Sequence, residues 1–219
     1  NIGIGIGCGG NITSGSTNIC MGSYTGYDIS TGGYNVAIGG GAGQNITTAS
    51  ENIGIGHYAL RGGDANLTGS YNIGMGDKAG YDLTTGQYNV LQGYQAGYNT
   101  TTASNTIAIG KSAMGTGVTT GADNIAIGQL AGNDLSSGSY NVLAGSSAGA
   151  NLTAAHNNVM IGRSAGAAST ASNRSIIIGT FANDLGAGVS DAIIMGNNAG
   201  SSVTGSNTIA IGEDAMGTG

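Results

Sequence analysis

The sequence predicts an all-β fold, a parallel β-solenoid of thirteen coils with about 17 residues in each coil. A glycine-rich unit recurs thirteen times along the 219 residues, and a fixed short period of this kind is typical of a solenoid. Within each unit large aliphatic residues alternate with small ones, which indicates a strand, and no segment has the apolar period of a helix. We expect residues 1–219 to form one repeat array, a fragment of a longer fibre protein, because the chain begins and ends inside a unit.

A glycine, here called the anchor, ends the apolar run of each unit. The anchors are Gly5, Gly22, Gly39, Gly56, Gly76, Gly93, Gly110, Gly128, Gly145, Gly162, Gly179, Gly196 and Gly212. Most intervals are 17 residues, but the interval after Gly56 is 20 residues and the one after Gly110 is 18. We interpret these two as loop insertions, at Leu60 to Asp64 and near Val118, which a stack of coils tolerates.

The residues just before each anchor predict a short strand with two different faces. Ile, Val or Met stands three and one positions before the anchor in nearly every unit, as at Ile53 and Ile55. We expect these aliphatic side chains to lie inside the coil. A mostly small residue stands between them, and we expect that face to pack against further chains through Ala37, Gly54, Gly74, Ala108, Ala126 and Ala210.

Asparagine stands four positions before the anchor in nine of the thirteen units. Coils stacked about 4.8 Å apart would place these amides one above another, where each can donate to the next. The pattern predicts a structural ladder of Asn35, Asn52, Asn72, Asn89, Asn124, Asn141 and Asn158. A turn that merely tolerates asparagine is the alternative interpretation.

The second half of each unit indicates a corner, a second strand and a turn. Ala follows most anchors by three positions, which indicates another buried position with little room. Pairs such as Asp82-Leu83 and Asn151-Leu152 come next and suggest a second strand. Thr-Thr-Gly or Ser-Ser-Gly runs then turn the chain back, with glycine where φ is positive.

Composition argues against several classes of function. The net charge is −6 and only 7% of residues are charged, so no basic patch can bind nucleic acid. No apolar stretch is long enough to cross a membrane as a helix. We predict no metal and no cofactor: His57 and His156 are isolated on turns, and Cys8 and Cys20 are either small buried residues or a disulfide. Carboxylates are scattered, no catalytic arrangement recurs, and the string Gly39 to Gly41 is not a phosphate loop, so we expect no catalytic residues and no enzyme activity.

Two families contain similar repeats. The run Asn-Ile-Ala-Ile-Gly-x-x-Ala, as at Asn124 to Ala131, resembles the head repeats of trimeric autotransporter adhesins such as the Yersinia adhesin. Arrays with added Leu-Thr-Thr-Gly segments also resemble repeats of bacteriophage tail fibres. The resemblance spans the chain and implies a left-handed β-roll in a three-chain bundle, with the small residues near the trimer axis. The unit here is longer than the adhesin repeat, so we expect the outer half of the coil to differ from it in shape.

These observations lead us to expect a structural, non-enzymatic fibre segment, either a virion tail fibre or a cell-surface adhesin, acting as a stiff spacer or adhesive surface. We therefore expect an extracellular location, a homo-oligomer, a trimer by the resemblance, and a host-surface glycan or protein as partner. The ten tyrosines cluster at corners, where they either cover the turn or offer a surface to a sugar. The alternative function is an ice-binding solenoid, because Thr or Ser recurs eight positions after the anchor, as at Thr47, Thr84, Thr101, Thr153 and Thr204.

Overall fold

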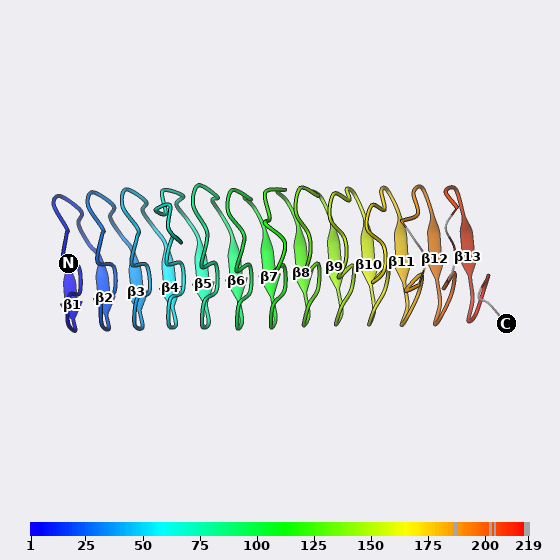
Figure 1. Ribbon diagram of the computed structural model, residues 1–219, viewed down its shortest axis with the longest axis horizontal. Helices are drawn as coiled ribbons and strands as arrows, with labels where there is room; N and C mark the ends of the chain where they lie inside the picture. The colour runs from blue at the N-terminus through cyan, green and yellow to red at the C-terminus, as the bar shows by residue number, and fades with distance from the viewer. Residues whose placement is uncertain (186–187, 202, 204, 217–219) are drawn as a thin grey trace. The chain divides into compact units, whose positions relative to one another are not determined.

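The computed structural model describes residues 1–185, 188–201, 203 and 205–216, and this part of the chain is all-β without a helix. It contains one parallel sheet whose thirteen strands follow chain order, which confirms the predicted β-solenoid (Figure 1). The strands are β1 (Ile2–Ile4), β2 (Ile19–Met21), β3 (Val36–Ile38), β4 (Ile53–Ile55), β5 (Ile73–Met75), β6 (Val90–Gln92), β7 (Ile107–Ile109), β8 (Ile125–Ile127), β9 (Val142–Ala144), β10 (Val159–Ile161), β11 (Ile176–Ile178), β12 (Ile193–Met195) and β13 (Ile209–Ile211). The chain forms two compact units, residues 1–108 and 109–219.

Neighbouring strands pair in the register that the repeat predicts. In the first unit, Ile53 of β4 lies opposite Ile73 of β5, although 20 residues separate them. In the second unit, Val142 of β9 lies opposite Val159 of β10. Equivalent positions therefore stack in columns, and the insertion after Gly56 does not shift the register.

The interior of the coil holds the small residues of the strands, which is the reverse of the expected orientation. Each of the six positions expected to contact other chains is buried within its own chain: Ala37, Gly54, Gly74, Ala108, Ala126 and Ala210. The aliphatic residues on either side of them point outward instead. The corner alanines and residues such as Ile29 and Leu60 are also buried inside the coils, and a small strand residue leaves room for them; in other coils Leu91 and Leu143 fill the same strand position.

Large and small residues complement each other inside the coils. Leu60 lies fully buried over the strand glycines, and a methyl group added at Gly74 would lie 2.7 Å from Leu60 Cγ. Leu60 therefore belongs to the interior and not to the inserted loop, which begins after it and exposes Asp64. The second insertion does expose Val118.

The expected second strand is replaced by a series of turns. Ile46, Leu83, Leu135 and Leu152 are fully buried, but their segments form isolated bridges at most, such as Ile46 with Leu67. Left-handed residues interrupt this part of the coil, and many of them are not glycine; Tyr34, Tyr88 and Tyr140 have φ of 60°, 59° and 62°. Backbone hydrogen bonds still connect the coils there, as from Asp134 N to Ala150 O at 2.9 Å.

Anchor glycines set the spacing between coils. Gly39 has φ of 121°, and a methyl group on it would lie 2.6 Å from the carbonyl oxygen of Gly56, the next anchor. The N–H groups of both anchors donate 2.8 Å hydrogen bonds to the preceding strand, Gly39 to Met21 O and Gly56 to Ile38 O. Only glycine combines this backbone conformation with such a close approach.

Candidate interaction surface

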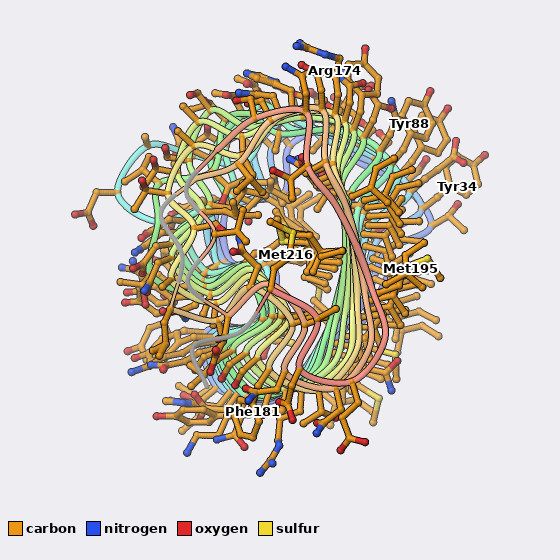
Figure 2. All side chains as sticks on the ribbon, turned by 90° about the vertical axis from the view of Figure 1, so that its right-hand side faces the viewer. Tyr34, Tyr88, Arg174, Phe181, Met195 and Met216 are labelled. Atoms are coloured by element: carbon orange, nitrogen blue, oxygen red, sulfur yellow. The ribbon has the colours of Figure 1, made fainter. Side chains whose placement is uncertain are left out.

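The outer face of the sheet is an uncharged aliphatic surface. It consists of the residues three and one positions before each anchor, and we call it the outer sheet face. In the second unit Ile127, Ile161 and Met195 are 44%, 40% and 37% exposed. Figure 2 shows Met195 pointing away from the coil. All 26 positions of this face are uncharged, and Gln92 and Ala144 are the two that are not Ile, Val or Met.

Tyrosines line one edge of the outer sheet face, five positions before the anchors. Tyr34, Tyr88 and Tyr140 are 62%, 56% and 61% exposed, and the first two point outward in Figure 2. Tyr71 and Tyr88 stack with ring centroids 4.9 Å apart. Glu51 stands in the same column, and its carboxylate raises the pKa of Tyr71. Polar or charged residues such as Asp123 occupy the other positions of this column, so the edge extends the apolar face only at its four tyrosines.

The predicted asparagine ladder is present in both units. Asn89 Nδ2 donates to Asn72 Oδ1 at 2.9 Å, and Asn141 Nδ2 donates to Asn124 Oδ1 at 3.0 Å. Each amide also donates a hydrogen bond to a backbone carbonyl of the next coil, as from Asn141 Nδ2 to Ala155 O at 2.7 Å. All seven asparagines of the ladder are buried. Because their amide groups are used inside the chain, the ladder stabilises the stack and offers no group to a ligand.

At one of the positions without asparagine, Ser175 continues the ladder. Ser175 N donates to Asn158 Oδ1 at 3.1 Å, and Ser175 Oγ donates to Val189 O at 3.1 Å.

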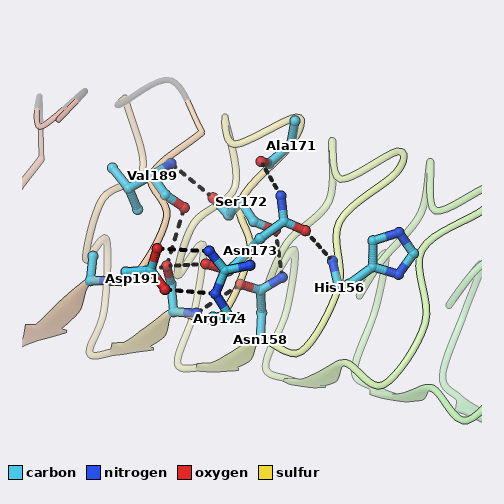
Figure 3. A network of polar contacts seen from close by, with 10 residues as sticks. His156, Asn158, Ala171, Ser172, Asn173, Arg174, Val189 and Asp191 are labelled. Atoms are coloured by element: carbon cyan, nitrogen blue, oxygen red, sulfur yellow. Dashed lines mark hydrogen bonds and ion pairs between the residues drawn. The ribbon is translucent and has the colours of Figure 1, made fainter. Parts of the chain in front are cut away.

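Nearby, Arg174 and Asp191 form a bidentate ion pair on the surface, with Nε–Oδ1 and Nη2–Oδ2 distances of 2.7 and 2.8 Å (Figure 3). Arg174 holds the pKa of the Asp191 carboxyl below its usual value. The exposure of both side chains makes this pair a minor contribution to stability.

The line of hydroxyl residues eight positions after the anchors is bonded along the stack. Thr84 Oγ1 donates to Thr101 O at 3.1 Å, and Thr153 Oγ1 donates to Thr170 O at 3.0 Å. Thr204 lies outside the described residues. Hydroxyl hydrogens that bond the next coil are unavailable to water, so this line is a weaker candidate surface than the outer sheet face.

The cysteines and histidines do not gather into a metal site. Both cysteines are free; Cys20 is buried, and Cys8 Sγ donates to Cys20 O at 2.7 Å. Burial, together with the neighbouring Cys8, raises the pKa of Cys20 to about 11. We expected His57 to be isolated, but its Nδ1 lies 3.5 Å from Asp77 Oδ2, because each of the two residues directly follows an anchor. Within the described residues, no three side chains of His, Cys, Asp or Glu converge as a metal would require.

Comparison with protein-family models, with curated proteins and with solved structures returned no match. In the described part of the chain, no helix has the length and apolar character needed to cross a membrane. The surfaces described above are therefore the basis for assigning a function.

Proposed function

We propose that this chain is a non-enzymatic structural segment of an extracellular fibre, on a virion or a cell surface, and that it assembles with further copies of itself through the outer sheet face. The observation that carries the proposal is the uncharged row of outward-facing aliphatic side chains, exposed or half-buried, in coil after coil of each unit. An apolar surface of this kind is typical of an interaction site.

A second copy of the chain is the occupant that fits this face. Stacked coils present side chains every 4.8 Å or so along the sheet, and a flat partner must match that spacing to interlock with them. Another copy has the same spacing and the same uncharged ridges. The buried small residues leave no other apolar strand face for this contact, so the homo-oligomer expected from the sequence is retained with a different interface. A three-chain bundle is the form that the resemblance to trimeric adhesins favours.

Substitutions at two adjacent residues distinguish an effect on assembly from an effect on folding. Ile127 is 44% exposed on the outer sheet face, whereas Ala126 is fully buried in the interior. We expect Ile127→Lys to weaken association about 100-fold or more, since it places a charge in an apolar contact, while the far-ultraviolet circular dichroism stays unchanged. Ala126→Lys should instead abolish the β signal.

Sedimentation velocity at several protein concentrations measures the assembly. Ser137→Lys, an exposed position in the same unit but outside the outer sheet face, is the matched control and should assemble like the unsubstituted chain. A chain that sediments as a monomer at 100 µM, or an Ile127→Lys variant that assembles normally, would refute the proposal.

An ice-binding function is the alternative. Its support is reduced by the hydroxyl groups of Thr84 and Thr153, which donate their hydrogens to backbone carbonyls of the next coil. Thermal hysteresis in a solution of the purified chain would favour this alternative, and its absence would count against it.

A further inference from the structure

A ridge of aromatic side chains runs along the corner that follows the strands in the first unit. Tyr24 packs against Tyr27 with ring centroids 5.6 Å apart. Two coils further on, Tyr58 meets Tyr81 edge to face at 6.0 Å, and Tyr81 stacks on Tyr98 at 5.0 Å. These contacts hold the rings in place, so the ridge is a rigid surface.

The ridge is broken by a notch one coil wide. In the coil between Tyr24 and Tyr58, the equivalent residue is Gly41 and the residue before it is Gly40. Two coils at about 4.8 Å each separate the backbones at Tyr24 and Tyr58 by about 10 Å. A cavity of about 270 Å³ opens there, lined by Ser23, Tyr24, Gly40, Gly41, Gln44, His57 and Tyr58.

Glycine is what keeps the notch open. A methyl group at Gly41 would collide with the ring of Tyr58, which leans over it. At Gly40 the nearest atom to an added methyl is His57 Cδ2 at 3.5 Å, an ordinary contact, so a side chain fits there and would enter the notch. The ring of Tyr58 therefore covers Gly41, and the recess is open over Gly40.

Neutral polar groups stand between the aromatic walls. Arg61 Nε donates to Gln44 Oε1 at 3.4 Å, and in the described part of the chain Gln44 Nε2 has no hydrogen-bond partner. His57 packs against Tyr58 with ring centroids 4.0 Å apart and the planes tilted by 49°, and it adds an imidazole; Ser23 adds an exposed hydroxyl. The residues that line the notch carry no fixed charge, and the opposite charges of Arg61 and Asp77 contact Gln44 and His57 without lining it, so the notch suits a ligand with no net charge.

We propose that this notch binds one neutral pyranose ring of a glycan. A sugar ring combines apolar C–H faces, which pack on tyrosine rings, with hydroxyl groups, which hydrogen-bond to Gln44, His57 and Ser23. The cavity is smaller than the roughly 300–1,000 Å³ of sites for drug-sized ligands, which limits it to a single ring. The inference goes beyond the proposed assembly. The corner and the outer sheet face are different surfaces: in the second unit, Phe181 stands at the equivalent corner position and points in a different direction from Met195 of the outer sheet face (Figure 2).

Binding of methyl glycosides of glucose, galactose, mannose and N-acetylglucosamine, measured by saturation-transfer NMR and titration, tests the site. We expect saturable binding of at least one of them. Gly40→Gln, which fills the notch, and Tyr24→Ala, which removes a wall, should each weaken it about tenfold. Tyr94→Ala is the matched control, because Tyr94 is an exposed corner tyrosine, 49% accessible, outside the notch, and it should change the affinity less than twofold.

Several outcomes would overturn the site. These are the absence of saturable binding to all four glycosides, unchanged affinity in both notch variants, or an equal loss in Tyr94→Ala. Circular dichroism of each variant checks folding, and Gly40→Gln keeps the test valid if Tyr24→Ala misfolds. Because sugar binding and sedimentation are separate measurements, failure of the site and failure of the proposed assembly are distinguishable.

Discussion

Alanine at Gly39 tests whether the anchor glycines set the spacing of the coils. The added methyl group would lie 2.6 Å from Gly56 O and 2.7 Å from Gly56 C, about 1 Å closer than an ordinary contact. Relief requires the next coil to move away by that amount, which stretches the 2.8 Å bond from Gly56 N to Ile38 O beyond hydrogen-bonding range. A φ of 121° adds backbone strain. Strain of about 1–3 kcal/mol and one or two lost hydrogen bonds of about 1 kcal/mol each predict a loss of about 2–5 kcal/mol.

Gly40→Ala is the control for this change, one residue away. Gly40 does not have a positive φ, and its added methyl makes only a 3.5 Å contact with His57. We expect stability to stay the same or rise by up to about 1 kcal/mol, because alanine restricts the unfolded chain. Urea denaturation followed by circular dichroism at one fixed protein concentration measures both variants. Equal midpoints for Gly39→Ala and Gly40→Ala would refute the role of the anchors.

Two further predictions concern buried polar groups. Asn141→Ala removes the donor to Asn124 and Ala155 and the acceptor for Asn158, so we expect the free energy of unfolding measured by urea denaturation to fall by about 3–5 kcal/mol. Asn157 is exposed, and Asn157→Ala should lower it far less. Similar losses in the two variants would contradict the ladder's role. Cys20 has a folded pKa raised to about 11 from 9.0, so its neutral thiol should resist iodoacetamide at pH 8 until urea unfolds the chain, and stability should fall as pH rises from about 9 to 11. Rapid alkylation of Cys20 in the folded chain would contradict this.

The repeat by itself determined the strands and the ladder. Position in a 17-residue period fixes which residues stack, and so the triplets Ile53–Ile55 and Val142–Ala144, and the asparagines before them, are identifiable from sequence alone. The ladder follows because parallel, in-register coils necessarily place identical amides one above another.

Only the tertiary structure decided which face of the strand lies inside. Both faces are apolar, so alternation does not distinguish them, and the choice depends on what the rest of the coil already places in the interior. One signal was present in the sequence: the middle position admits Leu91 and Leu143 but no polar residue, whereas the flanking position admits Gln92. The notch likewise required the structure, because the lean of Tyr58 over Gly41 follows from side-chain packing between coils, and no periodic pattern encodes it.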